Sequence, residues 1–331
     1  MKIQCSGCSK AYRINDNLVH QIYTQKVLCT DCGRLIPVEP FLLDPKELEP
    51  FLSGEALKHE VVNNLKKLYP MPHILLKARK LLAGTGNFQA LGDLLNTDPA
   101  LASRVLKVAN SAYYGMSGRV SSLQMAATVL GSGTLLQIIL LIGNAKALGR
   151  SLDGYGLNAG DLWRHALATA VCAELVAKKA HCDTGEDAFF AGLMHDAGKI
   201  ILDTYVLERK HLFQKYAKLT HAPLHDAETK ILGFTHGDIG YELCRKWNLP
   251  VHMATAIKDH HPPSTSGQAP LTSILQLANH MAGLTTGRPS GQSIPPLLLK
   301  ALHTLQITEH ELEELIGEAS TAVETLEEDT Y

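Results

Sequence analysis

Seven histidine and aspartate residues in the second half of the chain have the types and spacing of metal ligands. These side chains bind hard or borderline divalent ions. Successive groups are separated by about the length of a helix, so helices packed side by side could bring them together. A paired-metal centre of this kind typically carries out phosphate-ester chemistry. The set consists of Asp161, His165, His195, Asp196, His236, His260 and His261.

The local sequence predicts how helices would present these ligands. Asp161 and His165 are four residues apart, so both would project from one face of a helix. His195 and Asp196 are adjacent, and in a helix they would diverge by about 100°, which lets Asp196 lie between two ions. His236 follows Thr235, a suitable N-cap, and would stand at a helix start.

The remaining ligands lie at a predicted helix end. His260 and His261 precede Pro262 and Pro263, which stop a helix. Lys199, one turn after His195, is the one candidate catalytic residue, because its ammonium could contact a phosphate oxygen. A solvated helix lysine is an equally good interpretation of Lys199.

Four cysteines near the start form a second ligand set. Cys5 and Cys8, then twenty residues, then Cys29 and Cys32 have the spacing of a zinc ribbon. Each Cys-x-x-Cys turn offers two thiolates, and we expect one zinc in a closed four-thiolate site. Hydrophobic burial alone would not fold so small a module, so the metal would stabilise it directly.

Composition narrows the class of protein. The chain has 331 residues, of which 45% are hydrophobic and 19% are charged. Its formal net charge of -2 excludes a protein that is basic over its whole surface, as a non-specific nucleic-acid-binding protein would be. The longest apolar run, Leu135 to Gly143, is far shorter than the roughly 20 residues of a membrane span. The first residues contain no apolar signal core, so we expect a cytoplasmic protein with no membrane partner.

The periodicity of apolar residues predicts helices almost throughout. Asp98 and Pro99 form a helix start, with aspartate as N-cap and proline in the first turn. Prolines at 37, 40, 45 and 50 mark a linker before the helical region. We expect an all-α fold preceded by a small β-rich zinc ribbon, with helices near residues 122–130, 135–148, 161–179, 186–202, 237–247, 250–260, 269–284 and 309–326.

Motifs from about Leu68 to Pro263 resemble the HDOD family, a bacterial offshoot of the HD-domain metal-dependent phosphohydrolases. The resemblance lies in Tyr69 to Pro72, in DPAL with RVLKVANSAYYG, and in VSSLQMAATVLG. It continues in WRHALATA, AGLMHDAGK, FTHGDIGYELCRKWNLP and DHHPP, and it implies an all-helical fold. The first residues resemble a prokaryotic zinc-ribbon-type finger found on regulatory proteins. We therefore predict a finger over 1–40, a linker over 41–54, an HDOD domain over 55–263, and C-terminal helices with an acidic tail over 264–331.

The resemblance implies a weakened catalytic site. HDOD domains usually lack part of the catalytic set of their HD relatives and act in signalling. Compared with the related cyclic-di-GMP phosphodiesterases, this chain has an acidic residue at Asp161 and matches at the histidines, Asp196 and Lys199. The GYP substrate motif after the paired histidines is absent. The closing aspartate is also absent, and Asn279 stands in the position that resembles it, with His280 beside it. An amide is a weaker ligand than a carboxylate, so one ion should bind less tightly.

We therefore favour a bacterial signal-transduction protein whose HDOD domain binds a partner protein or a nucleotide-like ligand. One or two divalent ions (Fe, Mn, Zn or Mg) would occupy the histidine site. The first alternative is an active metal-dependent phosphohydrolase or phosphodiesterase. The second is a nucleic-acid-binding regulator that acts through the ribbon, where five basic residues are partly offset by three acidic ones. These are Lys2, Lys10, Arg13, Lys26 and Arg34 against Asp16, Asp31 and Glu39.

Overall fold

The structure is a computed structural model that describes residues 2–13, 26–37, 48, 51–68, 77–78, 81, 88–96, 98–115, 119–182, 184–261, 269–286 and 296–330. The chain divides into two compact units, residues 1–63 with 203–235 and residues 64–202 with 236–331. Several predicted features lie outside the described residues. These are Pro40, Pro45 and Pro50, the motif at 69–72, and Pro262 with Pro263.

The cysteine module consists of two short antiparallel hairpins. Strand β1 (Lys2–Gln4) pairs with β2 (Ala11–Arg13), and β3 (Lys26–Leu28) pairs with β4 (Leu35–Pro37). Each hairpin is a separate two-stranded sheet among the described residues. Ile3, Ile36, Cys5 and Cys29 form a small buried cluster, against which Tyr12 and Val27 pack. The prediction of a small β-rich N-terminal region is confirmed.

The rest of the first unit is helical. It contains most of α3 (Gly54–Leu68), the later part of α10 (Ala197–Glu208), α11 (Lys210–Thr220) and α12 (Leu224–Ile231). Arg209 is buried between α10 and α11, where its guanidinium donates to the carbonyl oxygens of Leu52 and Tyr205. The guanidinium also lies 4.6 Å from the centre of the Phe51 ring. Arg209 therefore fixes the segment that leads into α3.

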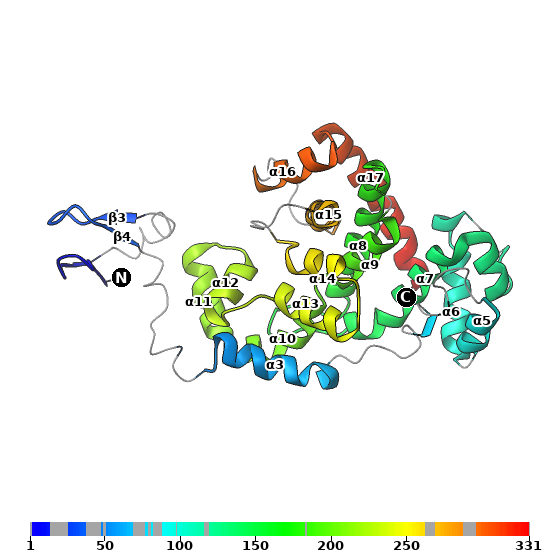
Figure 1. The fold of residues 1–331 in the computed structure, drawn as a ribbon, viewed down its shortest axis with the longest axis horizontal. Helices are drawn as coiled ribbons and strands as arrows, with labels where there is room; N and C mark the ends of the chain where they lie inside the picture. Colours follow the sequence, from blue (N-terminus) through cyan, green and yellow to red (C-terminus); the bar gives the residue numbers. More distant parts are fainter. Residues whose placement is uncertain are drawn as a thin grey trace. The chain divides into compact units, whose positions relative to one another are not determined.

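The second unit is a helical bundle built around α8 (Figure 1). Helix α8 (Asp161–Lys179) packs against α9 (Gly185–Met194), α15 (Pro270–Thr285), α17 (Glu309–Thr330) and α7 (Leu123–Leu148). Its buried side chains include Trp163, Leu167 and Val171. The remaining elements are α5 (Phe88–Asn96), α6 (Pro99–Ala109), η2 (Ala112–Tyr114), α13 (His236–Lys246), α14 (Val251–Lys258) and α16 (Pro296–Leu305).

Two predicted helix boundaries appear as expected. The Asp98 carboxylate accepts a hydrogen bond from the backbone N–H of Leu101 at 3.0 Å, which caps α6. Gly131 has φ 84° and ψ 164°, so α7 is two helices joined at a kink, as the separate apolar segments predicted. By length and composition α7 is the one described helix that could cross a membrane, but 56% of its most apolar window is buried.

One predicted helix is wrong. The expected helix over 186–202 is two helices, because α9 ends at Met194 and α10 begins at Ala197. His195 and Asp196 form the turn between them. The ligands therefore stand where the chain changes direction. The turn lets both side chains enter one site, whereas a continuous helix would have directed them about 100° apart.

Candidate metal centre

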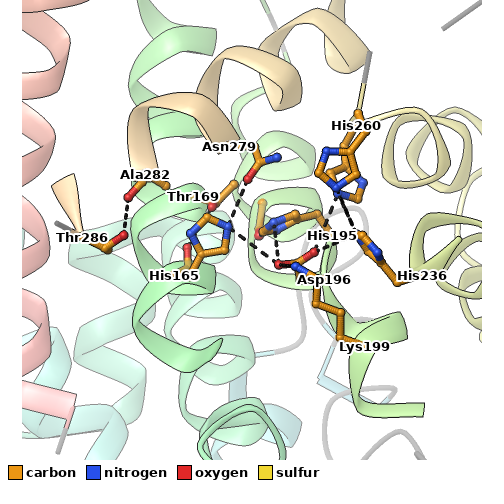
Figure 2. Close-up of polar contacts among 12 residues, drawn as sticks. His165, Thr169, His195, Asp196, Lys199, His236, His260, Asn279, Ala282 and Thr286 are labelled. Atoms are coloured by element: carbon orange, nitrogen blue, oxygen red, sulfur yellow. Dashed lines mark hydrogen bonds and ion pairs between the residues drawn. The ribbon is translucent and has the colours of Figure 1, made fainter. Parts of the chain in front are cut away.

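The predicted histidine and aspartate ligands converge on the carboxylate of Asp196, with one exception described below. Figure 2 shows this carboxylate between the ring of His165 on one side and the rings of His236 and His260 on the other. Two groups of candidate ligand atoms share it, and within each group all atoms lie within 4.8 Å of one another. We call them the three-histidine group (Asp196, His236, His260, His261) and the two-histidine group (His165, His195, Asp196).

The three-histidine group has the dimensions of a tetrahedral site. The Nε2 atom of His236 lies 3.1 Å from Asp196 Oδ1, 3.3 Å from His260 Nε2 and 3.1 Å from His261 Nε2. Asp196 Oδ1 lies 3.7 Å from His260 Nε2. A tetrahedral ion with ligands about 2.1 Å away separates those ligands by roughly 3.4 Å. The observed spacings bracket that value, so the residues present fit a divalent ion.

The two-histidine group uses the other carboxylate oxygen. Asp196 Oδ2 lies 3.4 Å from His195 Nε2 and 3.7 Å from His165 Nε2. The same oxygen accepts a hydrogen bond from the Lys199 ammonium at 2.6 Å. Across the group, Asn279 Oδ1 lies 3.0 Å from His165 Nε2. Asn279 therefore faces the centre, in the place where the resemblance predicted a lost aspartate.

Hydrogen bonds orient two of the rings toward the centre. His195 Nδ1 donates to the carbonyl oxygen of Gly192 at 2.7 Å, and His260 Nδ1 donates to that of Ile257 at 2.6 Å. Since each Nδ1 carries the proton, each Nε2 presents a lone pair, as metal-binding histidines do. Among the described residues, His195 Nε2 and Asp196 Oδ1 are buried without a hydrogen-bond partner. Such atoms are costly unless something binds them.

The protonation states also suit metal binding. Burial would raise the pKa of Asp196, but neighbouring His195 and Lys199 hold it well below its ordinary value. Burial, helped by His195 and His236, lowers the pKa of His260 well below its ordinary value. At neutral pH the carboxylate is therefore charged and the His260 ring neutral, which are the forms that bind metal.

Asp161 is the one predicted ligand that the structure does not bring into either group. Its carboxylate accepts a hydrogen bond from the backbone N–H of Asn158 at 2.7 Å, at the start of α8. The carboxylate thus stabilises the turn that begins the helix. His280, beside Asn279 on α15, also belongs to neither group.

Two glycines allow the helices to approach closely enough to assemble the site. A Cβ atom on Gly192 would lie 2.7 Å from the backbone of α8 at Ala170, so glycine lets α9 pack directly on α8. A Cβ atom on Gly198 would overlap the carbonyl oxygen of His236, where α10 meets the start of α13. Neither glycine was predicted to matter for the site, although Gly198 lies between Asp196 and Lys199.

The four cysteines also come together. Cys5 Sγ lies 3.5 Å from Cys32 Sγ, and Cys8 Sγ lies 3.5 Å from Cys29 Sγ. A tetrahedral zinc with sulfurs about 2.3 Å away separates those sulfurs by roughly 3.8 Å. The residue after each Cys-x-x-Cys turn is left-handed, at Ser9 (φ 61°) and Gly33 (φ 69°). The four sulfurs could therefore hold a metal ion.

A comparison with known protein families identifies the helical region. The family described as HDOD domain matches residues 68–263. The chain belongs to this family. The HDOD match begins at Leu68, the last residue of α3, and extends past the paired histidines, so both ligand groups lie within it.

Relatives of this HDOD chain include proteins of solved structure. An HDOD domain protein of unknown function from Geobacter sulfurreducens is 24% identical, with a TM-score of 0.65 over 81% of this chain and 97% of that one. A protein from Marinobacter aquaeolei, provisionally named for signal transduction, is 21% identical, with a TM-score of 0.64 over 82% and 64%. A protein from Shewanella amazonensis, provisionally named a phosphohydrolase, is 21% identical, with a TM-score of 0.63 over 81% and 97%. These likenesses show the fold.

A sequence relative has no described activity. An uncharacterized protein from Treponema pallidum is 25% identical over 263 residues, which are 77% of this chain and 50% of that protein. The chain thus spans about half the length of this relative.

Proposed function

We propose that this HDOD protein is a bacterial signal-transduction component whose helical region binds a partner protein or a nucleotide-like ligand. In this proposal it acts in the cytoplasm, and its metal centre stabilises the fold and has no effective phosphodiesterase activity. The observation on which the proposal rests is the contact between Asn279 and His165. A two-metal mechanism relies on anionic ligands to hold both ions at the separation that generates hydroxide. A neutral amide at this place removes one negative charge from that set.

The metal centre is well placed to stabilise the bundle. Its ligands come from α8, from the turn between α9 and α10, from the start of α13 and from the end of α14. An ion bound by the three-histidine group would connect three separate chain segments. Metal binding to such a site adds to the free energy of unfolding, because the unfolded chain does not present the ligands together.

The zinc ribbon offers a second contact surface in this proposal. Leu28 and Leu35 lie directly opposite each other on β3 and β4, and they are 58% and 50% exposed. In this proposal the two apolar side chains form part of a surface that contacts another protein. Zinc in the four-cysteine site would hold this surface in shape. Lys10 is paired with Asp31 at 3.2 Å, which reduces the positive charge available for nucleic acid.

The proposal is tested by metal analysis of the purified full-length protein together with a nucleotide screen. Cyclic-di-GMP and other cyclic and linear nucleotides would be assayed for hydrolysis with Mn²⁺, Fe²⁺ or Zn²⁺, and for binding by calorimetry. We expect bound metal and negligible hydrolysis. Asp196→Ala should lose the metal, whereas His252→Ala, an exposed histidine outside both groups, should keep it. Robust metal-dependent hydrolysis that Asp196→Ala abolishes would overturn the proposal.

The second candidate function is a metal-dependent phosphohydrolase. It is favoured by His195 Nε2 and Asp196 Oδ1, which are buried without a hydrogen-bond partner among the described residues and which a bound ion would satisfy. In that case Lys199 would release Asp196 and contact a substrate phosphate. The same screen separates the two functions, because only the second gives turnover.

A further inference from the structure

We infer that the helical unit binds one divalent ion in the three-histidine group, and that Asn279, paired with His165, leaves no second ion in the two-histidine group. This inference rests on the proposed function, which requires a metal at this centre. It goes further by stating how many ions bind, which residues hold the ion, and why the other position is lost.

The three-histidine group keeps a full set of ligands. Its four ligand atoms come from Asp196, His236, His260 and His261, at separations that suit a tetrahedral ion. The side chains of Asp196, His236 and His260 are almost completely buried. A set of one carboxylate and three imidazoles satisfies Mn²⁺, Fe²⁺ or Zn²⁺ without any contribution from His165 or His195.

The two-histidine group has lost its available ligands. Asp196 Oδ2 already accepts the Lys199 ammonium at 2.6 Å, and that side chain is only 15% exposed. His165 Nε2 is engaged by the Asn279 amide at 3.0 Å. This nitrogen is hydrogen-bonded whichever way the amide is turned, as donor to its oxygen or as acceptor from its nitrogen. His195 Nε2 is then the only ligand nitrogen of the group without a hydrogen-bond partner among the described residues.

The charges at the centre support the same conclusion. A second divalent ion would add a charge of about +2 to the centre, and the neutral amide of Asn279 supplies no negative charge to offset it. An ion entering this position would have to displace a buried ammonium and would gain only one free nitrogen.

Manganese binding to the full-length protein tests the inference. Mn²⁺ prefers oxygen and nitrogen ligands, so it leaves the zinc-loaded cysteine site undisturbed. After removal of free ions, elemental analysis gives the number of Mn²⁺ ions per chain. Electron paramagnetic resonance distinguishes an isolated ion from an exchange-coupled pair. We expect one isolated Mn²⁺ per wild-type chain.

Variants assign the ion to its group. His236→Ala and His261→Ala should weaken Mn²⁺ binding by more than about tenfold, whereas His165→Ala should retain one ion. The variant Asn279→Asp should bind a second Mn²⁺ and show a coupled spectrum. His252→Ala serves as the exposed control, and circular dichroism verifies that each variant is folded. If His236→Ala does not fold, His261→Ala and His165→Ala make the same comparison.

The outcomes separate this inference from the proposed function. Two coupled ions in the wild type, or equal loss of Mn²⁺ in His165→Ala and His261→Ala, would overturn the inference and leave the proposed function intact. Absence of any bound Mn²⁺, Fe²⁺ or Zn²⁺ beyond the cysteine site would overturn both. One ion that His261→Ala removes and His165→Ala retains would support the inference, even if a nucleotide were hydrolysed and the proposed function failed.

Discussion

Gly198 lies so close to the carbonyl oxygen of His236 that a Cβ atom on Gly198 would overlap that oxygen. The contact joins the first turn of α10, two residues after Asp196, to the start of α13, where His236 is a ligand of the three-histidine group. A methyl group here would have to push two backbone segments apart. The separation between Asp196 and His236 depends on this approach.

Gly198→Ala should therefore damage both the fold and the site. We expect a loss of about 1–3 kcal/mol in the free energy of unfolding, from overpacking against backbone that cannot move aside easily. Metal affinity should fall as well, because His236 is displaced from Asp196. Chemical denaturation and metal titration measure the two effects.

The matched control for this substitution is Gly317→Ala. Gly317 is exposed on α17, and a Cβ atom there would meet nothing within 4 Å. Alanine in an exposed helix interior should raise the free energy of unfolding by about 0.5–1 kcal/mol. Equal effects of the two substitutions on the free energy of unfolding would show that the close contact between Gly198 and His236 does not limit stability.

Removal of metal from the histidine centre should lower the melting temperature of the helical region. An ion present at 100 times its dissociation constant adds about 2.7 kcal/mol to the free energy of unfolding, and a chelator removes that contribution. Calorimetry with and without chelator should show the shift in the wild type and in His252→Ala, but not in His236→Ala. A chelator that leaves the wild-type melting temperature unchanged would contradict this prediction.

The cysteine module should hold its zinc partly through Tyr12. The Tyr12 hydroxyl donates to Cys29 Sγ at 2.9 Å and lowers the pKa of that thiol to about 6, which favours the thiolate that binds metal. Tyr12→Phe should speed zinc release to a coloured chelator by about tenfold. Tyr241→Phe, on α13, should leave the release rate unchanged. Free reaction of all four thiols with a thiol reagent before chelation would show that no zinc is bound.

The contact between α8 and α17 should respond to acid. The Lys179 ammonium lies 2.8 Å from a Glu311 oxygen, and with the Thr308 N–H it lowers the pKa of Glu311 from 4.5 to about 2. Because the folded pKa is depressed, the stabilisation is present above about pH 4.5 and is lost as the pH falls toward 2. Glu311→Gln should therefore destabilise the protein at pH 7 and have progressively less effect below pH 4.5.

Exposed Glu313, on the same helix, supplies the control for the acid response. Glu313→Gln should change the free energy of unfolding little at either pH, because Glu313 forms no ion pair with the described residues and surface substitutions are usually close to neutral. The measurement is urea denaturation at several pH values. A difference between wild type and Glu311→Gln that stays constant from pH 7 to pH 3 would refute the assignment.

Much of the helical architecture could be predicted from the sequence, because long segments with a helical period of apolar residues do not fit strands. The segment 161–179 was predicted with its observed bounds, and His236 stands at a helix start as expected. The break at His195 and Asp196 could not be predicted from periodicity, since apolar residues continue on both sides of it. Helices α11 and α12 were not predicted, because their short amphipathic stretches lie outside the recognised ligand motifs.

The convergence of the candidate site was also predictable in outline, because its ligands recur at intervals of about one helix. Asp161 shows the limit of that inference. Four-residue spacing places it on the same helix face as His165, but at the first turn a carboxylate can bind a preceding backbone N–H instead. The pairing of Lys199 with Asp196 follows a three-residue helical spacing, so the sequence did contain that signal.

The sulfur contacts in the cysteine module cross from one hairpin to the other. Cys5 lies beside Cys32, and Cys8 lies beside Cys29. Oxidation of a metal-free module would therefore favour disulfides between the hairpins, because exchange selects sulfurs that already touch. Cys8 and Cys32 are exposed, so oxidants reach one member of each pair directly. An oxidised module would keep its two hairpins joined through the same four positions, with covalent bonds in place of the ion.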